Sequence, residues 1–407
     1  MKRIIRLVSI ICMLALCLSM VLTGCSGNTQ NNENTNSTVS DGNQTEETKD
    51  AYRFAMVAPL TGNGAQYGLA YKDTIEIMVE QINADGGIDG HMVEVDYFDD
   101  KQDPKECLNI ANKIVADGDY LAVIGSQTSS CSMAAAPVLQ KAGIPMISPN
   151  ASHVDFPLIG DYIFSMAMPL SYEIVKTTDF LYDYNNLRKI AMIYSNDDWG
   201  LQVSEVCRER FTELGGEVVA EETYIAGQTK DFTPLISKIK ATEPDAVFLI
   251  SQYSDGAAIV QQMNQLDFNT KIVAMNTLYK QEFIDIVGEE LANGIVMQNS
   301  FSIIDTAPEY DVIKEAYESK TGKVMDLYVT HSHDAFAIVL DAVTEVGADK
   351  EAIRDYIAGI KNYAGLSGTF SMDANGSVRK NLYALEIKDG TFVELEDFVA
   401  EADIDVG

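Results

Sequence analysis

Basic residues are scarce in this sequence. Its 407 residues include 29 lysines and arginines against 61 aspartates and glutamates, which gives a formal net charge of −32. Nucleic-acid binding needs a basic surface to face the phosphates, so this balance argues against it. We interpret the acidity as a soluble, self-repelling surface rather than as a face that binds a charged partner.

Histidine is scarce as well, with four residues in the chain. His331 and His333 are two positions apart, and residues at that spacing do not share a helix face. No Cys-x-x-Cys pattern is present to suggest zinc. We therefore expect no metal, and we place His333 near a ligand cleft at the start of a helix.

Few cysteines remain once the N-terminus is set aside. Three of the six fall within the first 25 residues, which leaves Cys107, Cys131 and Cys207. Export would permit a disulfide, and Cys107 with Cys131 is the conceivable pair. Three structural thiols are the alternative, and the sequence leaves this open.

Signatures of enzymes and nucleotide cofactors are also missing. The chain has no Gly-x-Ser-x-Gly run. Gly62, Gly64 and Gly68 approach a dinucleotide fingerprint, but the third glycine would have to be residue 67, which is Tyr67. We predict no enzyme activity and no cofactor, and we read these glycines as places where the backbone turns close to a ligand.

The N-terminus has the pattern of a targeting segment. Lys2, Arg3 and Arg6 precede a mostly apolar run over residues 7–22. The run closes on Leu-Thr-Gly-Cys25, which resembles a bacterial lipobox and makes Cys25 the lipid-modified first residue of the mature chain. We predict a signal peptide over residues 1–25, a lipid anchor in the cell membrane and an extracytoplasmic location. An uncleaved transmembrane anchor is the alternative.

Residues 26–50 are polar, have no aromatic residue and are expected to form a disordered linker. The remaining residues, 51–407, are enough for two domains. Apolar strand patterns alternate with helical ones three times before residue 145, and the alternation resumes from about residue 170, with helices expected over 172–184 and 332–346. This order predicts an α/β fold of two doubly wound parallel-sheet lobes.

Polar clusters follow two neighbouring strands of the expected first sheet. The apolar run 120–125 leads into residues 126–131, and the run 144–147 leads into residues 148–152. Such turns lie beyond the carboxyl ends of parallel strands, where these folds bind ligands. Residues 128–130 also open a helix, whose free amides favour an anion. We predict that this region holds a small solute by its carboxylate.

Five runs in order along the chain resemble the leucine/isoleucine/valine-binding proteins of ABC importers, which are type I periplasmic binding proteins. They are PLTGNGAQYG, INADGGIDG, DDKQDPKECLNIANKIV, IGSQTSSCSMAAAPV and GIPMISPNAS. The resemblance implies two lobes joined by three hinge crossings, near residues 165–168, 298–301 and 370–373. The N-terminal lobe would hold residues 51–167 plus 300–371, and the C-terminal lobe residues 168–299 plus 372–407.

The same resemblance implies a ligand site on the first lobe. Ser129 would offer its hydroxyl and backbone N–H to a carboxylate, Ser152 would add its hydroxyl, and the carbonyl of Asn150 would accept from an ammonium group. The expected first-lobe set is Gln127, Thr128, Ser129, Ser130, Asn150, Ala151 and Ser152.

Aromatic residues would complete that site. By resemblance the ring of Tyr67 covers the ligand, Trp199 and Tyr253 close over it from the second lobe, and Tyr328 walls the side-chain pocket. Asn276 stands where the family commonly has an acid that neutralises the ammonium. Either Asp255 takes over that role, or the ligand is not a simple α-amino acid. Gln127 and Thr128 stand where aliphatic-specific members are more apolar, and together with Asn276 they favour a more polar ligand.

These inferences predict an extracytoplasmic solute-binding lipoprotein of an ABC transporter. It would be a monomer that binds a branched-chain amino acid, or a related amino-acid-like or amide-like solute, and delivers it to the permease by hinge closure. A ligand-sensing receptor subunit that feeds a signalling partner is the alternative, and an exported α/β enzyme is a third hypothesis.

Overall fold

The structure is a computed structural model that describes residues 51–184 and 186–402. The predicted signal peptide, the linker and Cys25 lie outside the described residues. Within the described part of the chain, no helix is long and apolar enough to cross a membrane.

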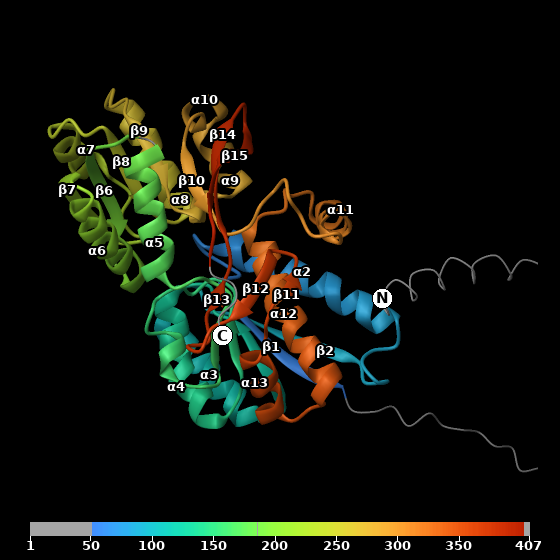
Figure 1. Ribbon diagram of the computed structural model, residues 1–407. Coiled ribbons are helices and arrows are strands. Elements are labelled where there is room, and N and C mark those ends of the chain that lie inside the picture. Colours follow the sequence, from blue (N-terminus) through green and yellow to red (C-terminus); the bar gives the residue numbers. More distant parts are fainter. Residues whose placement is uncertain (1–50, 185, 403–407) are drawn as a thin grey trace, which may run out of the picture. The chain divides into compact units, whose positions relative to one another are not determined.

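The first sheet has five parallel strands in the order β2-β1-β3-β4-β5 (Figure 1). They are β1 (Tyr52–Ala58), β2 (Val93–Asp99), β3 (Tyr120–Gly125), β4 (Met146–Ser148) and β5 (Ile163–Ser165). The strand predicted over residues 120–125 is confirmed residue for residue. It lies in the middle of the sheet and all six of its residues are buried, which explains why its sequence is continuously apolar.

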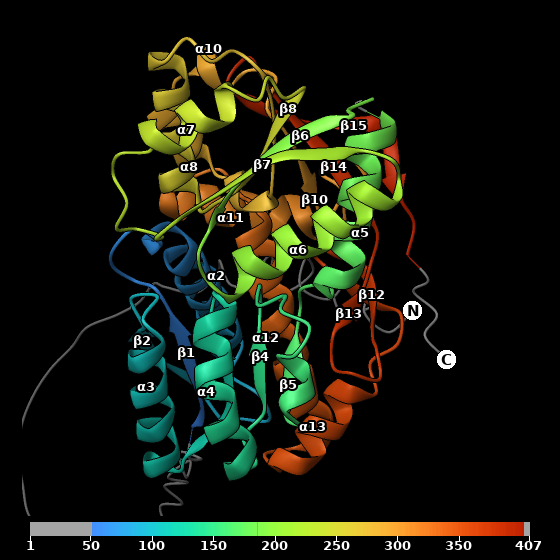
Figure 2. The same ribbon diagram turned by 90° about the vertical axis from the view of Figure 1, so that its left-hand side faces the viewer.

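Helices cover both faces of this sheet (Figure 2). One face carries α2 (Ala65–Ala84) and α12 (Leu327–Val346), and the other carries α3 (Pro104–Asp117) and α4 (Ser129–Ala142). Strand β1 contributes side chains to both faces, because successive side chains of a strand point to opposite sides. The ring of Phe54 packs edge-on against Phe336 of α12, and Val57 packs in the apolar cluster under α3 and α4.

Capping residues set where these helices begin. Asp103 caps α3 with Pro104 in its first turn, as predicted, and Thr128 accepts from the backbone N–H of Cys131 at the start of α4. Helix α12 begins five residues before the predicted residue 332, because the carboxylate of Asp326 accepts from the amides of the first turn. The segment 331–334 therefore lies inside a helix and not at its start.

The second sheet has seven strands in the order β15-β14-β10-β9-β8-β6-β7. The five strands from β6 to β10 are parallel to their neighbours, and β14 and β15 extend the sheet in antiparallel fashion. The strands are β6 (Lys189–Ser195), β7 (Glu217–Tyr224), β8 (Ala246–Ile250), β9 (Lys271–Ala274), β10 (Val296–Asn299), β14 (Leu382–Lys388) and β15 (Thr391–Ala400). The predicted α/β class with two parallel-sheet lobes is confirmed.

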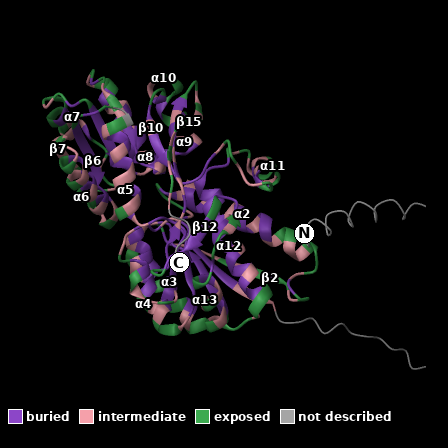
Figure 3. Cartoon of the chain, in the orientation of Figure 1, coloured by how far each residue is buried: buried purple, intermediate pink, exposed green. Residues whose placement is uncertain are grey.

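Helices again cover both faces, and the central strands β6, β8 and β10 are mostly buried (Figure 3). Met192 and Phe248 pack towards α5 and α6, whereas Ile193 and Leu249 pack towards α7 and α8. The helix predicted over 172–184 runs instead as α5 followed by a turn of π-helix over residues 180–184. The helices are α5 (Leu170–Asp179), α6 (Asp198–Glu213), α7 (Thr233–Lys240), α8 (Tyr253–Gln265), α9 (Gln281–Val287), α10 (Glu289–Ala292), α11 (Tyr310–Thr321) and α13 (Lys350–Ala358).

The chain passes between the two sheets three times. It leaves the first sheet after β5 and enters the second at β6. It returns after β10 to α12, which packs against α2, and it goes back to the second sheet at β14. A small antiparallel sheet of β11 (Tyr363–Gly365), β12 (Gly368–Met372) and β13 (Val378–Arg379) precedes that last crossing.

The three cysteines of the described chain are free thiols in the core, so Cys107 and Cys131 are not bridged. Their sulfur atoms and a carboxylate oxygen of Asp100 lie within 4.8 Å of one another. A hydrogen bond with Cys131 and burial both raise the pKa of Cys107, which keeps this thiol protonated.

Candidate functional site

A cavity lies between the carboxyl ends of strands from both sheets. From the first sheet it is lined by the turns after β3 and β4, together with the start of α12. From the second sheet it is lined by the start of α5 and by the turns after β6, β8 and β9. Nine predicted site residues line it: Gln127, Thr128, Ser129, Ser130, Asn150, Ser152, Trp199, Asn276 and Tyr328.

The start of α4 gives one wall of the cavity a set of hydrogen-bond donors. Amides in the first turn of a helix have no carbonyl partner within it. Ser129 and Ser130 are the first two residues of α4, and both line the cavity. Ser152 lines the same wall from the turn after β4. This wall therefore presents amides and hydroxyls that could hold an anionic group.

A fixed network lies behind Asn150. Its Oδ1 accepts from the hydroxyl of Tyr71 at 2.5 Å, and its Nδ2 lies 3.2 Å from Nδ1 of His331. On the other side of the imidazole, Nε2 lies 2.8 Å from Nζ of Lys380, while Nδ1 lies 3.1 Å from the carbonyl oxygen of Pro149. Since an ammonium group only donates, Nε2 accepts from Lys380, and the proton lies on Nδ1, which donates to the carbonyl of Pro149. With this tautomer the contact between Nδ2 of Asn150 and Nδ1 is not a hydrogen bond.

His331 lines the cavity, and His333 does not. Burial, followed by the positive charge of Lys380, holds the pKa of His331 well below its usual range, so the ring is neutral. The sequence placed His333 near the cleft because it put the start of the helix at residue 332. The helix begins at residue 327 instead, and His331 is the histidine of this segment that lines the cavity.

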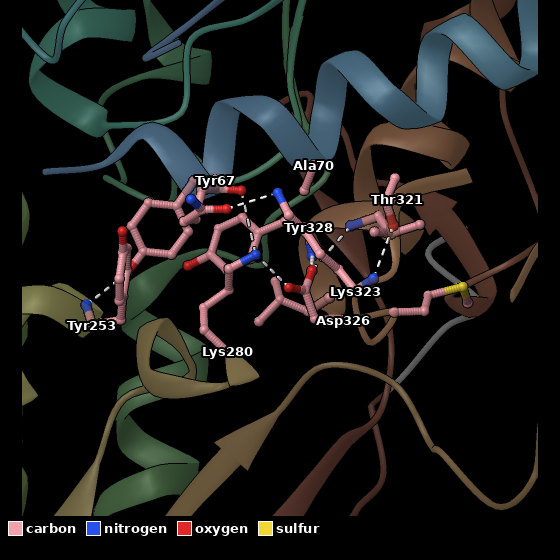
Figure 4. Close-up of polar contacts among 12 residues, drawn as sticks. Tyr67, Ala70, Tyr253, Lys280, Thr321, Lys323, Asp326 and Tyr328 are labelled. Carbon is pink, nitrogen blue, oxygen red and sulfur yellow. Dashed lines mark hydrogen bonds and ion pairs between the residues drawn. The ribbon is translucent and has the colours of Figure 1, made fainter. Parts of the chain in front are cut away.

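Tyr67 and Tyr253 do not line the cavity, contrary to what the resemblance implied. The hydroxyl of Tyr67 donates to the carbonyl of Thr277 at 2.9 Å and accepts from the backbone N–H of Tyr253 at 2.8 Å. The two rings pack edge to face with centroids 5.2 Å apart (Figure 4). Both of these tyrosines therefore join the two halves of the protein to each other.

An ion pair lies beside these tyrosines. Nζ of Lys280 lies 2.5 Å from a carboxylate oxygen of Asp326, and the two side chains are 2 % and 5 % exposed (Figure 4). The ammonium also lies over the rings of Tyr67 and Tyr328. We refer to Tyr67, Tyr253, Thr277, Lys280 and Asp326 together as the closed contact.

Two further expectations need correction. Ala151 is fully buried away from the cavity, because its N–H donates to Ser148 and its carbonyl accepts from Ser165. Asp255 does not line the cavity either. Its carboxylate accepts from the backbone N–H of Gly227 at 2.8 Å, so it is not the acid that replaces the one missing at Asn276.

Glu173 is one of the cavity residues that were not predicted from the sequence. It lies in the first turn of α5 and is 5 % exposed. Its Oε1 accepts from Nδ2 of Asn276 at 3.3 Å and from Nε2 of Gln298 at 2.5 Å. Burial raises the pKa of Glu173 to about 7. An acid in the first turn of a helix is common on surfaces, so the sequence contained no signal that this one is buried.

A metal is not suggested by this cavity. Among the described residues, the one group of three potential ligands close enough to share an ion is Asp100, Cys107 and Cys131, which is buried elsewhere. The cavity instead combines hydroxyls, amides, a neutral imidazole and a buried carboxyl group. These are groups that bind a small polar solute by hydrogen bonds and charge.

A sequence profile described as periplasmic binding protein matches residues 51–391, which is most of the chain. The chain belongs to this family. Members of the family bind solutes and are not enzymes, as the sequence predicted. Relatives include Leu/Ile/Val-binding proteins, which confirms the resemblance found in the sequence.

Two relatives and one protein of similar fold can be compared with this chain. The Leu-, Ile-, Val-, Thr- and Ala-binding protein of Pseudomonas aeruginosa is 23 % identical over 81 % of this chain and 88 % of its own length. The branched-chain amino acid transporter substrate-binding protein LivJ of Streptococcus pneumoniae, solved with isoleucine, is 25 % identical, has a TM-score of 0.78 and covers 85 % of this chain and 100 % of its own. An ABC-transporter solute-binding protein of Rhodopseudomonas palustris, solved with 3,4-dihydroxybenzoic acid, is 21 % identical, has a TM-score of 0.79 and covers 87 % of this chain and 98 % of its own.

Proposed function

We propose that this protein is the extracytoplasmic solute-binding component of an ABC importer. The observation that carries the proposal is the cavity between the two sheets, with the start of α4 and Ser152 on one wall and Trp199 on the other. The names of its relatives support a solute of the branched-chain amino acid class. The polar lining, which includes Gln127 and Asn276, favours a related amino acid or amide over a purely aliphatic one.

Binding would proceed in two steps. The carboxylate of the solute docks on the hydroxyls and amides of Ser129 and Ser152, in the first lobe (the chain up to β5 and from α12 to β13). The second lobe (the chain from α5 to β10 and from β14 onwards) then closes about the three crossings and brings Trp199 over the solute. The hydroxyl of Ser130, which donates to Asp198 at 2.7 Å, is a contact that such closure would make.

Delivery needs a membrane partner. We propose that Cys25 carries a lipid, that residues 26–50 link this anchor to the solute-binding lobes, and that the closed protein passes its solute to permease subunits. The lipobox-like run before Cys25 supports the anchor, and the relatives named as transporter components support the permease.

A thermal-shift screen tests this function. The panel contains the L-amino acids, small amides, and benzoate with its hydroxylated forms. A ligand present at about one hundred times its Kd should add about 2.7 kcal/mol to the free energy of unfolding. The proposal fails if no member of the panel raises the melting temperature.

A matched pair of serine variants then locates the site. Ser129→Ala should weaken binding of the best panel member by roughly ten- to a hundredfold, because it removes a hydrogen bond to a charged group. Ser237→Ala removes an exposed hydroxyl from α7, far from the cavity lining, and should leave Kd unchanged. Calorimetry that shows equal Kd values for both variants would count against this site.

A further inference from the structure

Glu173 is a buried acid that has no cation beside it. No lysine, arginine or histidine nitrogen in the described chain lies within ion-pair distance of its carboxylate, in contrast to Asp326, which pairs with Lys280. Lys380 attracts Glu173 electrostatically, but Nζ of Lys380 donates to His331 and Ser367. A buried carboxylate without a cationic partner is costly, so this arrangement needs an explanation.

The hydrogen bonds of Glu173 fall on one oxygen only. Both Asn276 and Gln298 donate to Oε1, and within the described chain Oε2 receives no donor. Nearby, Oε1 of Gln298 and Oε1 of the cavity residue Gln252 are buried acceptors without a partner in the described chain. This side of the cavity therefore has spare acceptors, whereas the opposite wall at Ser129 and Ser152 has donors.

We propose that Glu173 is the counter-charge for a cationic amino group of the solute. This inference rests on the proposed function and narrows the ligand class to small solutes that carry both a carboxylate and an amine. The carboxylate binds at the start of α4, and the ammonium donates to Glu173. The acid is thus supplied by α5. Asn276 stands where the family commonly has an acid, and here its amide donates to Glu173.

Other carboxylates near the site are less buried than Glu173 or lie outside the cavity. Asp197 lines the cavity, but it caps α6 by accepting from the backbone N–H of Gly200 at 2.8 Å. Asp198 accepts from Ser130, and Asp255 accepts from Gly227 outside the cavity. Glu173 is the acid that combines burial, a place in the lining and a free acceptor oxygen.

Binding of an amine at Glu173 should depend on pH. The charged or titratable groups that face Glu173 or share its cavity are Lys380, Tyr328, His331 and Asp197. Since the pKa of Glu173 is raised to about 7 by burial, the acid is partly protonated at neutral pH and must lose its proton to bind an ammonium. Affinity for the amine should therefore fall as the pH drops below about 7, by up to about tenfold per pH unit.

The experiment compares an L-amino acid that binds in the screen with its 2-hydroxy-acid analogue, which keeps the carboxylate and lacks the amine. At about pH 8, Glu173→Gln should weaken binding of the amino acid by at least about tenfold and change binding of the hydroxy acid by less than about threefold. Calorimetry gives both constants, and an unchanged circular dichroism spectrum checks the fold.

Two further variants keep the test sharp. Adding Asn276→Asp to Glu173→Gln places a carboxyl group on the side chain that Glu173 contacts, and should restore part of the preference for the amine. Asp255→Asn should leave that preference unchanged. The inference is overturned if Glu173→Gln weakens both probes equally, or if Asp255→Asn abolishes the preference.

The screen separates this inference from the proposed function. If benzoates or amides bind and no amine does, Glu173 is not a counter-charge, while solute binding in the cavity stands. If an amino acid binds the wild-type protein and Glu173→Gln with equal affinity, the counter-charge role is again rejected and solute binding in the cavity still stands. If nothing in the panel binds, the proposed function fails and this inference fails with it.

Discussion

The two lobes face each other in two neighbouring regions, the closed contact and the cavity. Both regions contain buried polar side chains, but these side chains have different roles. In the closed contact, the hydroxyl of Tyr67 has two partners and Lys280 has Asp326, so the polar groups satisfy one another. In the adjoining cavity, Glu173 has an acceptor oxygen to spare. Polar groups that satisfy each other hold a structure together, and polar groups with unused capacity are available to a ligand.

This difference separates Tyr67 and Tyr253 from the cavity, although the resemblance to the family implied that both contact the ligand. Tyr67 and Tyr253 come from polar segments after strands, which is where ligand-binding aromatic residues are expected. The backbone N–H of Tyr253 instead donates to the hydroxyl of Tyr67, which lies 186 residues away in the chain. The predictions below test the division between the closed contact and the cavity, beginning with the largest expected effect.

Removing the buried cation of the closed contact should have the largest effect on stability. Lys280→Met keeps a long side chain but leaves Asp326 buried without its partner, and should lower the free energy of unfolding by about 3–5 kcal/mol. Lys320→Met removes a cation from the exposed pair with Glu80, and should cost less than about 1 kcal/mol. Urea unfolding measures both, and equal losses would contradict the assigned role of the closed contact.

Glu173→Gln should act on stability with the opposite sign. In the folded protein without a ligand, the pKa of Glu173 is raised to about 7 from the model-compound value of 4.5. The folded state thus holds this proton more tightly than the unfolded state, and the resulting stabilisation is present below about pH 4.5 and lost as the pH rises through 7. The variant should be more stable than the wild type at about pH 8, by on the order of 3 kcal/mol, and the gain should vanish near pH 5.

The measurement for this prediction is the free energy of unfolding against pH for both proteins. A constant difference across the pH range would mean that folding does not raise the pKa of Glu173. Saturation with an amine-bearing ligand should reduce the gain, because the ligand then supplies the missing cation.

Tyr67→Phe should have a smaller effect, again confined to stability. The substitution leaves the carbonyl of Thr277 and the N–H of Tyr253 without their partner, and should cost about 2 kcal/mol. Ligand affinity should change by less than about threefold, because the ring does not line the cavity.

Tyr97→Phe is the matched control, since burial and nearby acids, and no hydrogen bond, account for the environment of the Tyr97 hydroxyl among the described residues. Unfolding and calorimetry on the same samples give both quantities. A large loss of ligand affinity in Tyr67→Phe at unchanged stability would show that Tyr67 contacts the ligand.

Much of this protein could be predicted from its sequence, because the relevant signals are local. Alternation of apolar strands with amphipathic helices requires two covered parallel sheets, and the buried strand at residues 120–125 was predicted without error. The donors at the start of α4 were also predictable, because a hydroxyl-rich turn between a strand and a helix determines its own backbone geometry.

Only the tertiary structure decided which side chains have spare hydrogen-bonding capacity. Whether Tyr67 faces a ligand depends on Thr277 and Tyr253, and whether Glu173 is a surface acid or a buried one depends on Asn276 and Gln298. These partners lie more than a hundred residues away along the chain, so no local pattern records them. The sequence determines which polar groups are present. Folding determines which of them have hydrogen-bond partners within the protein, because a buried polar group without a partner is costly.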